Sequence, residues 1–192
     1  GLPLGPDRSR AGSGPISRRS STDLGEGRRP RKRTPQESSV GGGHDELMRE
    51  VIESFEVVGL PLRTSNREAA RTIPAHWEAA AAAGLVGVPG TEAYAVYTDY
   101  ETPFDVVSSA YTLIIGRRGE AIGPGRDDLV VARIPASARD VVVVSDSRPE
   151  SIVEAWAGIW ARQDLPRDYR ADYECYAPDG SVRLSVGVLP AA

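Results

Sequence analysis

The sequence predicts an α+β domain built from two copies of a strand-helix-strand-strand unit. The tripeptide Asp99-Tyr100-Glu101 recurs as Asp172-Tyr173-Glu174. A helical stretch precedes each copy, and an apolar strand follows it, at residues 111–116 in the first and 182–187 in the second. Both helical stretches carry an isoleucine and a tryptophan four residues apart, at Ile73 and Trp77 and at Ile152 and Trp156. Two copies indicate a duplicated domain, because a solenoid needs about three repeats or more.

Residues 1–47 have the composition of a disordered tail. They are rich in Gly, Pro, Ser and Arg and show neither a helical nor a strand period. The basic run at residues 28–33 is more typical of a solvated tail than of a nucleic-acid-binding arm. The single methionine, Met48, stands where the ordered pattern begins. We therefore expect a folded domain at residues 48–192, preceded by a tail that need not belong to the natural protein.

The composition excludes several classes of protein. No stretch approaches the ~18 apolar residues of a membrane span, and none has the layout of a secretory signal. The single cysteine, Cys175, excludes an internal disulfide and a multi-cysteine metal site, and His44 and His76 form no metal-ligand pattern. The glycine-rich stretches match no phosphate loop. We expect a soluble, cytoplasmic protein without metal or cofactor, whose acidic domain disfavours nucleic acid and favours cationic partners.

In the first half, residues 51–62 predict a strand and residues 67–83 a helix. Thr64-Ser-Asn66 offers an N-cap for this helix, and Gly84 is a normal residue at its end. Pro74 within the helix predicts a kink or a division into two segments. Two strands follow, at residues 92–101 and 109–117.

The second half repeats this order from about residue 128. The unbroken valine run at residues 141–144 is typical of a central strand that is covered on both faces. Residues 149–163 predict a helix with Ser147 as N-cap and Pro149 in its first turn. The strands of this half are expected at residues 129–134, 140–145, 169–176 and 181–189.

Residues 169–176 carry the most informative pattern, an aromatic-rich strand bounded by turn residues. Side chains on a strand alternate between its faces, so Asp172, Glu174 and Tyr176 share one face with Arg170. Cys175 lies on the other face, as a small buried apolar residue. The acidic row indicates either an exposed polar face or the wall of a pocket. Periodicity alone favours exposure, because charged residues are rarely buried, whereas the second copy of the tripeptide favours the pocket.

The ordered set of motifs resembles the GyrI-like small-molecule-binding family, whose effector-binding domain is also fused to some AraC-type and MerR-type regulators. The motifs cover about residues 51–189. They are Thr64-Ser-Asn66, Ile73 with Trp77, Tyr94-x-x-Tyr97-x-Asp99-Tyr-Glu101, the strand at 111–116, Ile134-Pro135, Trp156 with Trp160, and Arg167-x-Tyr169-x-x-Asp172-Tyr-Glu174-x-Tyr176. No DNA-binding domain accompanies them, which resembles the stand-alone members. The chain departs from the family at two places. It has Arg139-Asp140 where the family often has an aromatic residue, and it has Tyr173 where phenylalanine is frequent.

The resemblance implies a curved antiparallel sheet with both helices on one face and a ligand cleft between the halves. It also implies that the ligand is a lipophilic, often cationic, aromatic small molecule, bound for sensing or sequestration. A carboxylate in an apolar cleft is desolvated and, unless it is paired, attracts a cation. Each aromatic ring adds ~0.5–2 kcal/mol of attraction. The predicted ligand-binding residues are Glu174 as the charge partner at the cleft floor, with Tyr176, Tyr111, Tyr97, Trp77 and Trp156 as the walls.

Two other functions remain open at this stage. Some GyrI-like proteins are hydrolases of cyclopropane-containing genotoxins; in that hypothesis Glu174 is a general base and Tyr111 or Tyr176 polarises the electrophile. The lack of a second catalytic constellation favours binding over hydrolysis. The third hypothesis is an interaction with an unknown protein partner, such as gyrase inhibition. It predicts a filled cleft and an exposed acidic patch with Asp99, Glu101 and Asp172.

Overall fold

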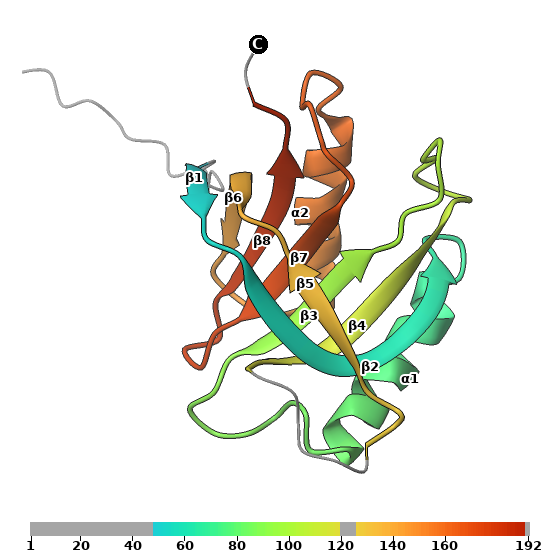
Figure 1. The fold of residues 1–192 in the computed structure, drawn as a ribbon, viewed down its shortest axis with the longest axis vertical. Coiled ribbons are helices and arrows are strands. Elements are labelled where there is room, and N and C mark those ends of the chain that lie inside the picture. The colour runs from blue at the N-terminus through green and yellow to red at the C-terminus, as the bar shows by residue number, and fades with distance from the viewer. Residues whose placement is uncertain (1–47, 120–125, 191–192) are drawn as a thin grey trace, which may run out of the picture. The chain divides into compact units, whose positions relative to one another are not determined.

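The computed structural model describes residues 48–119 and 126–190, so the predicted tail at residues 1–47 lies outside the described residues. Within the described part, eight strands form one antiparallel sheet in the order β1-β6-β8-β7-β3-β4-β2-β5. The sheet is strongly curved (Figure 1). This is the α+β fold with a curved antiparallel sheet that the resemblance implied.

Both halves follow the predicted order of strand, helix, strand and strand. The first half comprises β2 (Phe55–Ser65), α1 (Ala69–Ala82), β3 (Ala93–Thr98) and β4 (Ala110–Arg118). The second comprises β6 (Ser137–Val144), α2 (Pro149–Ala161), β7 (Ala171–Tyr176) and β8 (Val182–Val188). The outermost strands of the sheet are β1 (Met48–Ile52) and β5 (Val130–Ile134). Strands β3 and β7 pair at the centre, so the two halves join side by side in one sheet.

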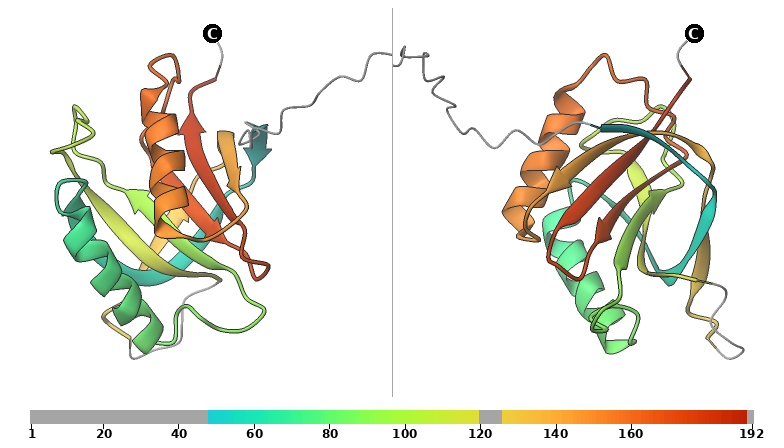
Figure 2. Two further views of the ribbon diagram at one scale, coloured as in Figure 1. Left: turned by 180° about the vertical axis from the view of Figure 1, so that it is seen from behind. Right: turned by 90° about the vertical axis from the view of Figure 1, so that its left-hand side faces the viewer.

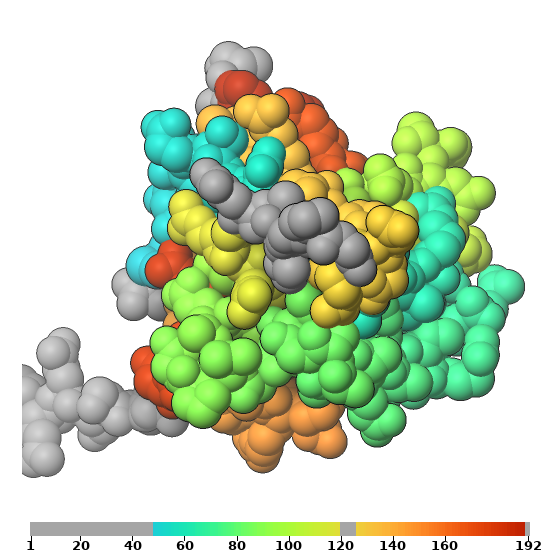
Figure 3. Space-filling model, turned by 60° about the horizontal axis from the view of Figure 1, so that its bottom comes forward, coloured from blue at the N-terminus to red at the C-terminus, as the bar shows by residue number. Residues whose placement is uncertain are grey.

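Both helices cover the same face of the sheet. Helix α1 packs against β2 and β4, and α2 packs against β6 and β8. Figure 2 shows the two helices next to each other on that face. In the space-filling view of Figure 3, α1 and the residues after it (green) form much of one end of the domain, with α2 (orange) below. Neither described helix is long and apolar enough to cross a membrane.

The predicted first strand at residues 51–62 is wrong, because two strands occupy this region. Strand β1 pairs with β6 of the second half, whereas β2 pairs with β4 and β5. The chain therefore crosses from one half of the sheet to the other between Ile52 and Phe55. The residues between them, Glu53 and Ser54, carry no proline or glycine that would have marked the break.

Helix α1 begins later than the capping pattern predicted. Its N-cap is Glu68, without a side-chain cap hydrogen bond. Asn66 instead donates to the carbonyl of Val106 at 2.7 Å and accepts from the Tyr111 hydroxyl at 2.9 Å. The helix is one segment that includes Pro74, not two. Gly84 follows its end with a φ of 71°, the left-handed conformation for which glycine was predicted there.

Helix α2 begins at Pro149, which lies in the first turn as predicted, but Ser147 is not the N-cap. The N-cap is Arg148, whose backbone N–H donates to Oδ1 of Asp146 at 3.0 Å. This bond is made to the N-cap residue itself, so no side chain caps the free N–H groups of the first turn.

The two matching tripeptides occupy different structural positions. Asp172 and Glu174 lie within β7 and are buried, whereas Asp99 and Glu101 follow the end of β3 and are exposed. Within the sheet, Glu174 lies opposite Ala95 of β3. It does not lie opposite Glu101, its match in the first tripeptide. The tripeptide match therefore does not mark equivalent residues, although each half has the same order of elements.

The face of the sheet away from the helices has its own apolar core. It contains Tyr94, Val96, Ile114, Tyr173 and Cys175. Tyr173 and Cys175 lie on this face, so their neighbours Asp172, Glu174 and Tyr176 point toward the helices, as strand alternation predicted. The burial of Asp172 and Glu174 shows that the interpretation of this row as an exposed polar face is wrong.

Candidate functional site

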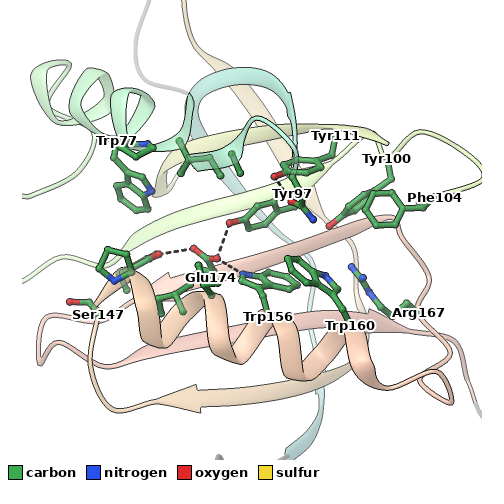
Figure 4. Close-up of a pocket in the computed structure, with 18 residues that line it drawn as sticks. Trp77, Tyr97, Tyr100, Phe104, Tyr111, Ser147, Trp156, Trp160, Arg167 and Glu174 are labelled. Carbon is green, nitrogen blue, oxygen red and sulfur yellow. Dashed lines mark hydrogen bonds between the residues drawn. The ribbon is translucent and has the colours of Figure 1, made fainter. Parts of the chain in front are cut away.

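A pocket of about 530 Å³ lies between the two helices and the centre of the sheet. Its walls come from both halves of the domain (Figure 4). All six residues that the sequence predicted as ligand-binding line this one pocket: Glu174, Tyr176, Tyr111, Tyr97, Trp77 and Trp156. The fold thus brings the predicted set together, and ligand binding by it stays a prediction.

Glu174 lies on β7 at the centre of the pocket and is 2% exposed. Its Oε1 accepts from the Tyr97 hydroxyl at 2.8 Å and from Nε1 of Trp156 at 2.6 Å. Its Oε2 accepts from the Tyr176 hydroxyl at 2.7 Å. The expected unpaired carboxylate is therefore hydrogen-bonded three times. All three donors are neutral, and no arginine, lysine or histidine of the described residues forms a salt bridge with it.

The surroundings of Glu174 oppose its ionisation. Burial raises the pKa of this carboxyl, and the hydrogen bonds from Trp156, Tyr176 and Tyr97 only partly lower it again. Burial, assisted by the charge of Glu174, also raises the pKa of Tyr97 and of Tyr176 well above the usual range, and that of Tyr111 to about 12. The tyrosines therefore remain neutral donors at physiological pH.

The two tyrosines considered for hydrolysis differ in their contacts. The Tyr176 hydroxyl donates to Glu174, whereas the Tyr111 hydroxyl donates to Asn66 at 2.9 Å. Tyr97 instead of Tyr111 completes the set of donors around the carboxylate. Tyr111 contributes its ring to the pocket wall, and the centroids of the Tyr111 and Tyr97 rings are 5.5 Å apart.

A second buried acid, Asp172, lies two residues from Glu174 and has a different environment. It forms a salt bridge with Arg167, accepts from the Tyr100 hydroxyl at 2.7 Å and accepts from the backbone N–H of Gly187 at 2.8 Å. Asp172 is fully buried, and the pocket is open. The exposed patch with Asp172 and the filled cleft, which the protein-interaction hypothesis requires, are both absent from the described residues.

No family model matches the chain, and no curated protein matches it. Solved structures do share its fold. An integron cassette protein from the mobile metagenome of Vibrio cholerae is 24% identical, with a TM-score of 0.61 over 74% of this chain and 95% of that one. The protein SAV2435, solved bound to tetraphenylphosphonium, is 13% identical, with a TM-score of 0.58 over 75% and 94%. The fold is the one that the GyrI-like resemblance implied. At these identities, the likeness shows the fold alone.

A further solved structure with this fold is a putative bacterial transcription regulation protein from Staphylococcus aureus MU50. It is 14% identical, with a TM-score of 0.56 over 77% of this chain and 100% of that one.

The pocket includes residues that the sequence reasoning did not assign to it. They are Asn66, Tyr100, Phe104, Trp160 and Arg167, among others. Trp160 could have been found, because it lies four residues after Trp156 on the same side of a helix. Tyr100 could not, because strand alternation from Tyr97 places it on the opposite face. Asp99 has a φ of 50°, and this left-handed residue ends the alternation and turns Tyr100 toward the pocket.

The chemistry of the pocket is that of an apolar aromatic cavity with one carboxylate charge. Within the described residues, no three His, Cys, Asp or Glu side chains form a group that could hold a metal ion. The arrangement can stabilise a positive charge next to Glu174, and the hydroxyl oxygens of Tyr97 and Tyr176, whose O–H groups donate to Glu174, can accept hydrogen bonds beside it.

Proposed function

We propose that this domain binds lipophilic aromatic cations in the pocket, with Glu174 as the charge partner, and so acts in sensing or sequestering such compounds. The observation that carries the proposal is the environment of Glu174, a buried carboxylate that is held by three neutral donors and has no cationic partner among the described residues.

The physical reason is that hydrogen bonds fix the position of the carboxylate but leave its charge uncompensated. Removing a charge from water is costly, and a cation that enters the pocket offsets part of this cost. The aromatic walls attract the same cation through their ring faces, by ~0.5–2 kcal/mol for each ring. Such a site selects delocalised charge and shape without a rigid hydrogen-bond pattern. The binding of tetraphenylphosphonium by SAV2435, which has the same fold, supports this choice of ligand class.

Two ligands of nearly equal shape and opposite charge, tetraphenylphosphonium and tetraphenylborate, test the proposal. All three tryptophans of the chain line the pocket, so their fluorescence reports on its occupation. We expect saturable quenching by the cation and a much weaker response to the anion. Glu174→Gln keeps the size of the side chain and removes its charge, so this variant is expected to lose at least about tenfold in affinity for the cation, because it loses the attraction between two opposite charges in a site of low dielectric constant.

Glu101→Gln is the matched control. Glu101 ends the first copy of the tripeptide, is exposed and does not line the pocket. We expect this variant to bind tetraphenylphosphonium as the unchanged protein does. Equal binding of the cation and the anion, or equal loss in both variants, would mean that Glu174 is not the charge partner.

One observation supports hydrolysis as a second function. A general base works best when its pKa lies near the operating pH, and burial raises the pKa of Glu174 in that direction. In this hypothesis the Tyr176 hydroxyl, which donates to Glu174 in this structure, turns its single O–H to the electrophile and polarises it. Product formation from cyclopropane-containing electrophiles, compared between the unchanged protein and Glu174→Gln, tests it: turnover that the variant lacks supports hydrolysis, and binding without turnover contradicts it.

A further inference from the structure

Arg167 lies toward one end of the pocket, away from Glu174 and the three donors that surround it (Figure 4). Figure 4 shows its guanidinium beside Trp160, on the far side of Trp156 from Glu174, with Phe104 opposite. The residue precedes β7 and is held by a bridge to Val188, so its backbone position is set by the sheet. Its side chain is only 6% exposed and lines the pocket.

The hydrogen-bonding capacity of Arg167 is largely unused. A guanidinium carries five N–H donors. Nη2 of Arg167 binds Asp172, and neither Nε nor Nη1 has a partner among the described residues. Nε is closed off from solvent, so Nη1 is the nitrogen left to meet a ligand. The ring of Tyr169 lies 4.4 Å from Cζ, and that of Tyr100 lies 5.8 Å away. Aromatic rings already contact the guanidinium, so the capacity that remains is for hydrogen bonds.

The charge of Arg167, in contrast to that of Glu174, is already compensated. Asp172 is fully buried and forms a salt bridge with it. A second carboxylate at Arg167 would face Asp172, and like charges at close range repel each other. The N–H groups of Nη1 nevertheless lose their water when a ligand fills the pocket, and a donor that is then left without an acceptor is costly. The site therefore lacks an acceptor oxygen but does not lack a negative charge.

On these observations we propose that the preferred ligand is an aromatic monocation that carries a neutral hydrogen-bond acceptor, such as an ester or amide carbonyl, and that Arg167 binds this acceptor. The inference rests on the proposed function, because the cationic part of the ligand lies at Glu174. Arg167 then determines specificity: it distinguishes cations of the same aromatic core by the substituent that reaches the far end of the pocket.

Three dyes with one tetramethylxanthylium core separate the possibilities. Tetramethylrosamine has no acceptor on its phenyl ring, tetramethylrhodamine methyl ester has a neutral carbonyl there, and tetramethylrhodamine has a carboxylate. Fluorescence anisotropy gives the dissociation constant of each for residues 1–192. We expect the methyl ester to bind roughly tenfold more tightly than the rosamine, as a hydrogen bond to a charged group implies, and more tightly than the free acid.

The variant Arg167→Met with Asp172→Asn removes the guanidinium without leaving a buried carboxylate unpaired. In this variant the ratio of the two affinities, methyl ester to rosamine, is expected to fall to about one, since the hydrogen bond that separates them is lost. A loosened pocket would weaken both dyes together and leave the ratio unchanged. Arg162→Met with Asp140→Asn is the matched control, because this pair forms a salt bridge at 2.8 Å but neither residue lines the pocket. The control is expected to keep the ratio.

Every other outcome of the dye experiment contradicts a specific part of the two proposals. Equal affinity for the methyl ester and the rosamine in the unchanged protein, or a ratio that persists in the Arg167 variant, overturns the acceptor site and leaves cation binding intact. Tightest binding of the free acid overturns the neutral acceptor in favour of an anion. Failure of both cationic dyes, together with tetraphenylphosphonium, overturns the proposed function itself.

Discussion

At the scale of single residues, Glu174 links the proposed function to stability. Its pKa in the folded protein is raised by burial, so its carboxyl contributes stability that is present below the pKa of the unfolded chain and is lost as the pH rises through the folded pKa. Glutamine stays neutral throughout. We therefore expect Glu174→Gln to become more stable relative to the unchanged protein as the pH rises above about 4, where an unfolded glutamate ionises. Thermal unfolding at a series of pH values measures this; a difference that does not vary with pH contradicts it.

The same residue predicts a coupling between ligand and proton. A cation beside Glu174 favours its ionised form and lowers its pKa, so binding at a pH below the raised pKa releases up to about one proton. Affinity for tetraphenylphosphonium should then increase with pH and become constant above the pKa of the free protein. Calorimetry in two buffers of different ionisation enthalpy counts the protons. Glu174→Gln should show neither proton release nor pH dependence.

At the scale of the elements, the backbones of β2 and β4 approach each other closely at a pair of glycines. Gly59 lies opposite Gly116, and a Cβ on Gly116 would lie 1.9 Å from the carbonyl oxygen of Val58. Gly116→Ala must therefore separate two backbones, and we expect it to lower the free energy of unfolding by about 1–3 kcal/mol or more. Urea unfolding followed by circular dichroism measures the change.

A second glycine provides the contrast. Gly158 lies on the exposed side of α2, and a Cβ there meets nothing within 4 Å. Gly158→Ala should raise stability by about 0.5–1 kcal/mol, because alanine loses less conformational freedom in a helix than glycine does. If the two substitutions changed the free energy of unfolding equally, the close approach of β2 and β4 at Gly116 would not restrict which residue can stand there.

At the scale of the whole molecule, the pocket exists only because the two halves meet. Helix α1 contributes Ile73 and Trp77, α2 contributes Ile152 and Trp156, and Glu174 lies on the central strand β7. A ligand at a free concentration of 100 times its dissociation constant stabilises the folded state by about 2.7 kcal/mol. We expect amide hydrogen exchange to slow in both helices when tetraphenylphosphonium is bound. Slowing in one helix alone would mean that the ligand does not lie between the halves.

Features of the fold that depend on residues close together in the sequence could be predicted, whereas features that depend on distant residues could not. The facing of Asp172, Glu174 and Tyr176 follows from strand alternation, and the shared side of Ile152 and Trp156 follows from helical spacing. Both patterns are local, so both were confirmed. The first strand was wrong because β1 and β2 differ only in their distant partners, and Tyr100 was missed because a single left-handed residue, Asp99, ends the alternation.

The sequence by itself determined the order of strand, helix, strand and strand in each half, the face on which the acids lie and six of the residues that line the pocket. Only the tertiary structure decided which groups form hydrogen bonds or salt bridges with each buried carboxylate. Tyr97 reaches Glu174 across 77 residues, and Tyr100 reaches Asp172 across 72. The pairing of Asp172 with Arg167, and the three neutral donors at Glu174, arise when β3, β7 and α2 pack together. Periodicity records which way a side chain points, but a charge is stabilised by whichever groups the fold brings within hydrogen-bonding distance.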